Sequence, residues 1–142
     1  MNNIKKKIGI FLIVTALAMS MLSGVALAAR QIGTITNFNV PVSATNESQV
    51  PLARTKAVTG RRGVVNLSGT ATGSPIITAT MRNSNKESRG TTTLRQGERV
   101  TFATPNALAN FNYWLWLRST QVPHVPQITH VVISGSWSPD ES

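Results

Sequence analysis

The sequence predicts an all-β fold, a small antiparallel β-sandwich of about seven strands. Three observations predict it. Short apolar stretches after residue 30 alternate with polar residues, which is the period of a strand with one buried face. No stretch after residue 30 carries the long 3.6-residue apolar stripe of a helix. Gly, Pro and Asn recur between the apolar stretches as turn residues, and the abundant Thr favours strands because its branched Cβ fits the pleat.

Residues 1–28 have the three parts of an export signal. A basic segment over 1–7 precedes an apolar run over 8–22, and Ala26-Leu27-Ala28 satisfies the small-x-small rule for cleavage. The alternative is an uncleaved membrane anchor, but an apolar run of about 15 residues is shorter than the roughly 20 that span a bilayer. We therefore expect a cleavable signal peptide over 1–28 and one β-sandwich domain over 29–142. The protein is expected to be secreted, with at most a loose association with the cell wall.

The strands are expected in chain order, with turns between them. Gly73-Ser74-Pro75 separates the second strand from the third, so these two are expected to form a hairpin. Residues 43–49 are expected to form a loop, and residues 54–62 a basic, partly extended stretch. The seven expected strands are 32–42, 64–72, 76–83, 91–95, 98–104, 111–119 and 128–137.

Alternation also assigns the faces of these strands. In the first strand, alternation places Ile32, Phe38 and Val40 on one face. Ile35 is the apolar residue that breaks this pattern, because it falls on the opposite face. In the strand 111–119, alternate residues from Phe111 to Leu117 face one way and Asn112, Trp114, Trp116 and Arg118 face the other. The expected core consists of Val65, Leu67, Ile77, Met81, Phe102, Tyr113, Leu115 and Leu117.

Groups for catalysis or metal binding are scarce. The five acids, Glu47, Glu87, Glu98, Asp140 and Glu141, fall in expected loops, beside a turn or in the C-terminal tail, which we expect to be solvated. His124 and His130 are the only histidines, no Gly-x-Ser-x-Gly elbow accompanies them, and cysteine is absent. The sequence therefore predicts a protein that is not an enzyme and has no cofactor or metal. A secreted hydrolase that uses His124 or His130 is the alternative.

Positive charge is the most informative feature. The formal charge is +9 and falls to +6 when the signal takes Lys5, Lys6 and Lys7 away; nine of the eleven remaining cations are Arg. Arginine grips phosphate and carboxylate with a planar fork. The candidate anion-binding residues form two groups in the sequence, Arg54, Lys56, Arg61 and Arg62, then Arg82, Lys86 and Arg89. The other interpretation, which we favour because neighbours in sequence need not share a face, is that these cations serve solubility on separate faces.

Three tryptophans form a candidate aromatic surface: Trp114, Trp116 and Trp137. Trp114 and Trp116 lie on one face of their strand, where exposed rings would form a stacking platform for sugars or an anchor at a membrane interface. A central strand that is covered on both faces explains the same pattern without a ligand, and we favour this interpretation.

Several short motifs are shared with a known group of proteins. They are a Ser-Gly step (Ser68-Gly69), a Gln-Gly turn (Gln96-Gly97), an aromatic Leu-Arg strand (Trp116-Leu117-Arg118) and the tail Gly135-Ser136-Trp137-Ser138-Pro139-Asp140. With the export signal, this layout resembles a family of small secreted proteins of Gram-positive bacteria that carry a domain of unknown function. The resemblance implies no site residues. It implies a setting only, since some members are associated with bacteriocin or transport systems.

These features lead to one functional hypothesis with two alternatives. The protein is expected to bind an anionic polymer of the cell envelope, a membrane surface or a protein partner, while nucleic acid is not expected as its partner in vivo. The alternatives are a bacteriocin-like, membrane-active protein and a subunit of an extracellular matrix or fibre, because Thr-rich sandwiches can add strands edge to edge.

Overall fold

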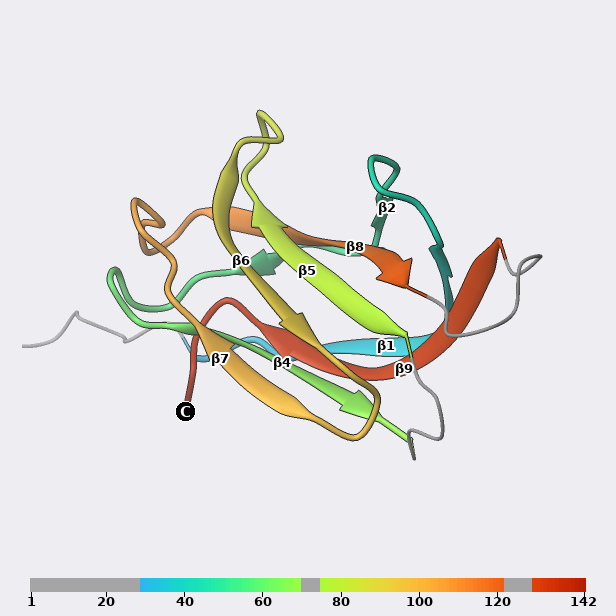
Figure 1. Cartoon of the computed structure of the whole chain (residues 1–142). Helices are drawn as coiled ribbons and strands as arrows, with labels where there is room; N and C mark the ends of the chain where they lie inside the picture. The colour runs from blue at the N-terminus through green and yellow to red at the C-terminus, as the bar shows by residue number, and fades with distance from the viewer. Residues whose placement is uncertain (1–28, 70–74, 122–128) are drawn as a thin grey trace, which may run out of the picture.

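The computed structural model describes residues 29–69, 75–121 and 129–142. These residues form two antiparallel sheets and no helix, so the predicted β-sandwich is confirmed (Figure 1). The expected signal peptide over residues 1–28 lies outside the described residues. Within those residues the strands number nine rather than seven, because two two-residue strands, β2 (Ser48–Gln49) and β3 (Arg54–Thr55), form within the segment 43–62.

The first sheet has the strand order β1-β9-β4-β7. Its central strands, β9 and β4, pair with each other, and Val65 lies opposite Trp137. Gly135 of β9 lies opposite Leu67, and an added Cβ there would come within 2.1 Å of the Asn66 carbonyl oxygen, so only glycine fits this approach. The bounds are Gly33–Pro41 for β1, His130–Ser138 for β9, Gly63–Ser68 for β4 and Arg99–Phe102 for β7.

The second sheet has the order β2-β8-β5-β6, and β3 also pairs with β8. Its longest strand, β8, runs beside β5 with Thr80 opposite Trp116 and Arg82 opposite Trp114. The bounds are Ser48–Gln49 for β2, Arg54–Thr55 for β3, Ile76–Arg82 for β5, Ser88–Leu94 for β6 and Asn112–Gln121 for β8.

The expected hairpin between 64–72 and 76–83 is wrong. β4 lies in the first sheet between β9 and β7, whereas β5 lies in the second sheet between β8 and β6. The chain therefore changes layers between these strands, as it does again between β6 and β7 (Figure 1). Gly73 and Ser74 of the expected turn lie outside the described residues.

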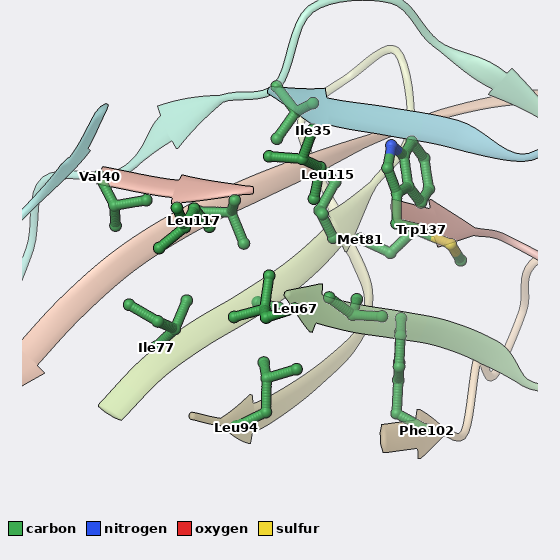
Figure 2. Packing of buried hydrophobic residues seen from close by; sticks show 14 of the residues in the cluster. Ile35, Val40, Leu67, Ile77, Met81, Leu94, Phe102, Leu115, Leu117 and Trp137 are labelled. Carbon is green, nitrogen blue, oxygen red and sulfur yellow. The ribbon is translucent and has the colours of Figure 1, made fainter. Parts of the chain in front are cut away.

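The inner faces of the two sheets meet in one hydrophobic core. Side chains from β1, β4, β7 and β9 point toward those of β5, β6 and β8, as Leu67, Phe102 and Trp137 do toward Met81 and Leu115 (Figure 2). Each of the eight expected core residues is buried. The other large core members are Ile35, Val40, Leu94, Ile133 and Trp137.

The predicted faces of the first strand are wrong at its beginning. Ile35 is buried and Ile32 is 57% exposed, opposite to the expectation. A bulge between Ile35 and Phe38, with Asn37 at a φ of 44°, inserts an extra residue into β1. Because a bulge reverses the side-chain alternation, Ile35 before it and Val40 after it both face the core.

Candidate functional site

The outer face of β8 carries the two neighbouring tryptophans. Tyr113, Leu115 and Leu117 point into the core, whereas Trp114 and Trp116 lie on the opposite face and are partly exposed. The favoured interpretation, a strand buried on both faces, is therefore wrong, because no third layer of described residues covers this sheet. Trp137 is also corrected: its side chain is 1% exposed in the core, so it is not part of an aromatic surface.

Two cations lie against the Trp116 ring. The Arg82 guanidinium carbon is 5.9 Å from the ring centroid and the Lys86 ammonium nitrogen is 6.0 Å from it. Arg82 ends β5, and Lys86 stands in the turn to β6 at a φ of 62°. The Asn83 side-chain oxygen fixes this turn by accepting hydrogen bonds from the backbone N–H groups of Asn85 and Glu87. The turn therefore holds the Lys86 ammonium beside an indole face that attracts cations.

Glu47 is the main carboxylate on this face. Its Oε2 accepts hydrogen bonds from Nε and Nη2 of Arg82 at 3.2 and 2.8 Å, and its Oε1 lies 3.6 Å from Arg118 Nε. Arg89 pairs with Glu87 at 2.5 Å. Among the described residues, Lys86 takes part in no ion pair. This face therefore carries an excess of positive charge. Its cations are Arg82, Lys86, Arg89 and Arg118, and its carboxylates are Glu47 and Glu87. The sequence predicts a loop at Glu47 but carries no sign of its pairing with these arginines.

Three adjoining hollows cross the outer face of this sheet. The largest, about 470 Å³, lies between the turn of Asn83 and the exposed Phe111, beside Trp114. A second, about 410 Å³, is lined by Glu47, Arg82, Lys86 and Trp116 with two polar neighbours. A third of about 200 Å³ joins them, because it shares Trp114 with the first, and Lys86 and Trp116 with the second. We call this continuous feature the β8 groove.

Phe111 was assigned to the core side of its strand, and this prediction is wrong. β8 begins one residue later, at Asn112, and Asn110 before it has a φ of 66°, so Phe111 leaves the alternation and is 59% exposed. The hydroxyl of Tyr113 holds the preceding loop: it accepts a hydrogen bond from the Leu108 N–H at 2.8 Å and donates one to the Leu108 carbonyl at 3.2 Å. This loop forms one wall of the β8 groove.

Only one of the two candidate anion-binding groups forms a single surface in the structure. Arg82, Lys86 and Arg89 lie at one β-turn and line the groove. The group 54–62 does not form one surface. Lys56 is fully buried, which contradicts its assignment to anion binding, and Arg54 is half-buried with Nη1 on the Ala53 carbonyl. Arg61 and Arg62 are exposed at the other end of this segment, and Arg62 donates to the Thr101 carbonyl.

The residues considered for catalysis do not gather in the described parts of the chain. His130 is exposed at the start of β9, and its Nδ1 lies 3.0 Å from Thr129 Oγ1; His124 lies outside the described residues. Over 29–69, 75–121 and 129–142, no group of three or more His, Asp or Glu side chains is arranged to hold a metal ion. A search of the same residues found no helix that is long and apolar enough to cross a membrane.

Comparison of the chain with protein-family models, with curated proteins and with solved structures found no match. The resemblance to the secreted Gram-positive family stays a prediction from the short motifs. Glycines of two of these motifs have structural roles that do not depend on the resemblance. Gly97 has a φ of 83° in the turn from β6 to β7, and Gly135 admits the close approach of β9 to β4.

Proposed function

We propose that the protein is a secreted, non-enzymatic β-sandwich that acts at the cell envelope by binding an anionic polymer in the β8 groove. The observation that carries the proposal is the position of Lys86, which pairs with no carboxylate of the described residues and is held over the Trp116 ring next to Arg82. A phosphate or carboxylate group of a polymer would complete the ion pairing of Lys86, while the Nε and Nη2 groups of Arg82 stay on Glu47.

The charge of the whole domain supports the same ligand class. The expected mature chain carries a formal charge of +6, which raises the local concentration of a polyanion and steers it toward the surface. Export, expected from residues 1–28, would place the domain where anionic wall polymers are abundant. The multiple repeats of such a polymer also suit a long groove, because several weak contacts add along one chain.

Binding to isolated cell walls tests the proposal. The full chain is expressed with its export segment, the processed product is purified, and its sedimentation with walls is measured over a salt series. We expect retention at low salt that falls as ionic strength rises, because salt screens contacts between exposed charges. Lys86→Gln should weaken retention, whereas the matched control Arg99→Gln, which removes the same charge from β7 in the other sheet, should have a smaller effect.

Three outcomes would contradict the proposal. One is no retention at low salt. Another is equal loss of retention in Lys86→Gln and Arg99→Gln, which would mean that net charge acts without a site. The third is release of dye from anionic phospholipid vesicles by the protein at about micromolar concentration, without wall binding, since this would favour the membrane-active alternative.

A further inference from the structure

We infer that the ligand of the β8 groove is an acidic glycan, with a sugar ring against Phe111 and Trp114 and an anionic group beside Trp116 and Lys86. The inference rests on the proposed function and narrows its ligand. A polymer of phosphate groups alone would use only the charged end of the groove. A glycan that carries both uncharged sugar rings and acidic groups would use both ends.

The end near Phe111 is suited to an uncharged ring. Phe111 is 59% exposed and Leu108 is 50% exposed, and both line the 470 Å³ hollow with the partly exposed Trp114. The C–H face of a pyranose is apolar, so it packs on an aromatic ring, whereas a bare phosphate chain has no such face. The lining holds one charged side chain, Arg89, which is already paired with Glu87.

Side-chain amides surround these aromatic rings. An amide offers both donors and an acceptor, which matches the hydroxyl and acetamido groups at the rim of a sugar ring. Asn106 and Asn110 have φ values of 60° and 66°, and these left-handed positions turn the chain in the loop before β8. The five asparagines that line this hollow are Asn83, Asn85, Asn106, Asn110 and Asn112. The Asn83 amide is engaged by the turn and Glu87, and Asn112 Oδ1 accepts a hydrogen bond from Thr55, so the amides of Asn85, Asn106 and Asn110 are the ones we assign to the sugar.

The end near Trp116 is suited to an acidic group. Glu47, Arg82 and Lys86 line this 410 Å³ hollow, and in the described parts of the chain Lys86 is the cation among them that has no ion pair. The two ends belong to one groove, because the hollow between them is lined by Trp114, Trp116 and Lys86. From Asn112 to Trp116 strand β8 covers about 13 Å, at roughly 3.3 Å per residue, and Phe111 lies just before it, so the groove is long enough for linked sugar rings.

Calorimetric titration with three probes separates the sugar from the charge. Hyaluronan oligosaccharides carry acetamido sugars and carboxylates, chitin oligosaccharides carry acetamido sugars alone, and inorganic polyphosphate carries charge alone. We expect hyaluronan oligosaccharides to bind more tightly than either of the others. Trp114→Ala should weaken their binding about tenfold, as loss of a stacked ring does, and should change polyphosphate binding by less than about twofold.

Matched variants show whether a loss of binding reflects the ring itself. Trp114→Phe keeps an aromatic face and should restore most of the affinity for hyaluronan oligosaccharides. Val132→Ala removes an exposed apolar side chain from β9 in the other sheet and should leave it unchanged. Thermal unfolding of each variant verifies the fold before titration.

The inference is overturned if polyphosphate binds as tightly as hyaluronan oligosaccharides and Trp114→Ala affects neither. Binding of polyphosphate that still depends on Lys86 would then leave the proposed function in place without its sugar specificity. If no probe binds and isolated walls are not bound either, both proposals are overturned. Tight binding of chitin oligosaccharides without any effect of Lys86→Gln would also overturn the requirement for an acidic group.

Discussion

Lys56 Nζ lies 3.3 Å from Asp140 Oδ1, and both side chains are fully buried although 84 positions separate them in the sequence. The ammonium group also donates hydrogen bonds to the carbonyls of Arg61 and Pro139, each at 2.6 Å. Asp140 accepts hydrogen bonds from the backbone N–H groups of Ala57 and Val58. Burial lowers the pKa of Lys56, and the Asp140 carboxylate opposes this shift. The pair fastens the C-terminal segment to the segment that follows β3.

Breaking this pair should destabilise the fold strongly. Lys56→Met leaves a buried carboxylate and Asp140→Leu leaves a buried ammonium, and we expect each to cost about 3–5 kcal/mol of unfolding free energy. The double variant should cost much less than the sum, since no uncompensated charge remains. Denaturant unfolding of the four proteins in the cycle measures this. Additive single effects would show that the two charges do not interact.

The bulge in β1 predicts opposite behaviour for two isoleucines. Ile35→Ala should lower the unfolding free energy by about 2–5 kcal/mol, because it opens a cavity between the sheets. Ile32→Ala changes a side chain that is 57% exposed and should have an effect within about 0.5 kcal/mol. Chemical denaturation of both variants measures the difference. A larger loss at Ile32 than at Ile35 would contradict the position of the bulge.

The Tyr113 hydroxyl is predicted to hold the wall of the β8 groove. Tyr113→Phe keeps the buried ring but removes both hydrogen bonds to Leu108, which should cost about 1–2 kcal/mol. Hydrogen exchange at the Leu108 amide should accelerate more than exchange in the sheet, because the loop is released locally. If the Leu108 amide exchanges as slowly as before, the hydroxyl does not hold this loop.

Cleavage of the expected export signal is predicted after Ala28, with a cut after Ala29 as the alternative. Mass spectrometry of protein collected from the culture medium should give an N-terminus at Ala29. Ala28→Leu should slow processing, because the position before the cut requires a small residue. Ala29→Ser is the matched control, since it changes the residue on the other side of the cut. Recovery of the intact chain from the medium would contradict a cleavable signal.

The sequence was sufficient to predict the sandwich, because its strands alternate and its core residues are large and apolar. The sequence was insufficient where a strand or a side chain contacts residues that are far away along the chain. The pairing of β4 with β9 instead of β5 depends on residues far along the chain, and the burial of Lys56 depends on Asp140. A lysine beside three arginines is typical of a solvated surface, so the sequence pattern groups Lys56 with the exposed cations.

The candidate site was predicted only in part, because its residues come from strands and loops that are distant in the sequence. Alternation placed Trp114 and Trp116 on one face correctly, and the charge pattern identified Arg82 and Lys86 as neighbours in the chain. Alternation cannot tell whether another layer covers that face. Phe111 was missed because a left-handed residue, Asn110, precedes the strand and ends the alternation. Glu47 was missed because a carboxylate in a loop gives no sign of which arginine it meets.

The most direct test of the account uses the indole N–H signals of the three tryptophans in nuclear magnetic resonance spectra. Titration with an acidic wall polysaccharide should shift the signals of Trp114 and Trp116 and leave that of the buried Trp137 in place. Assignment by single Trp→Phe variants identifies each signal. Shifts confined to Trp137, or no shift of any indole signal while the polymer is bound, would contradict binding in the β8 groove.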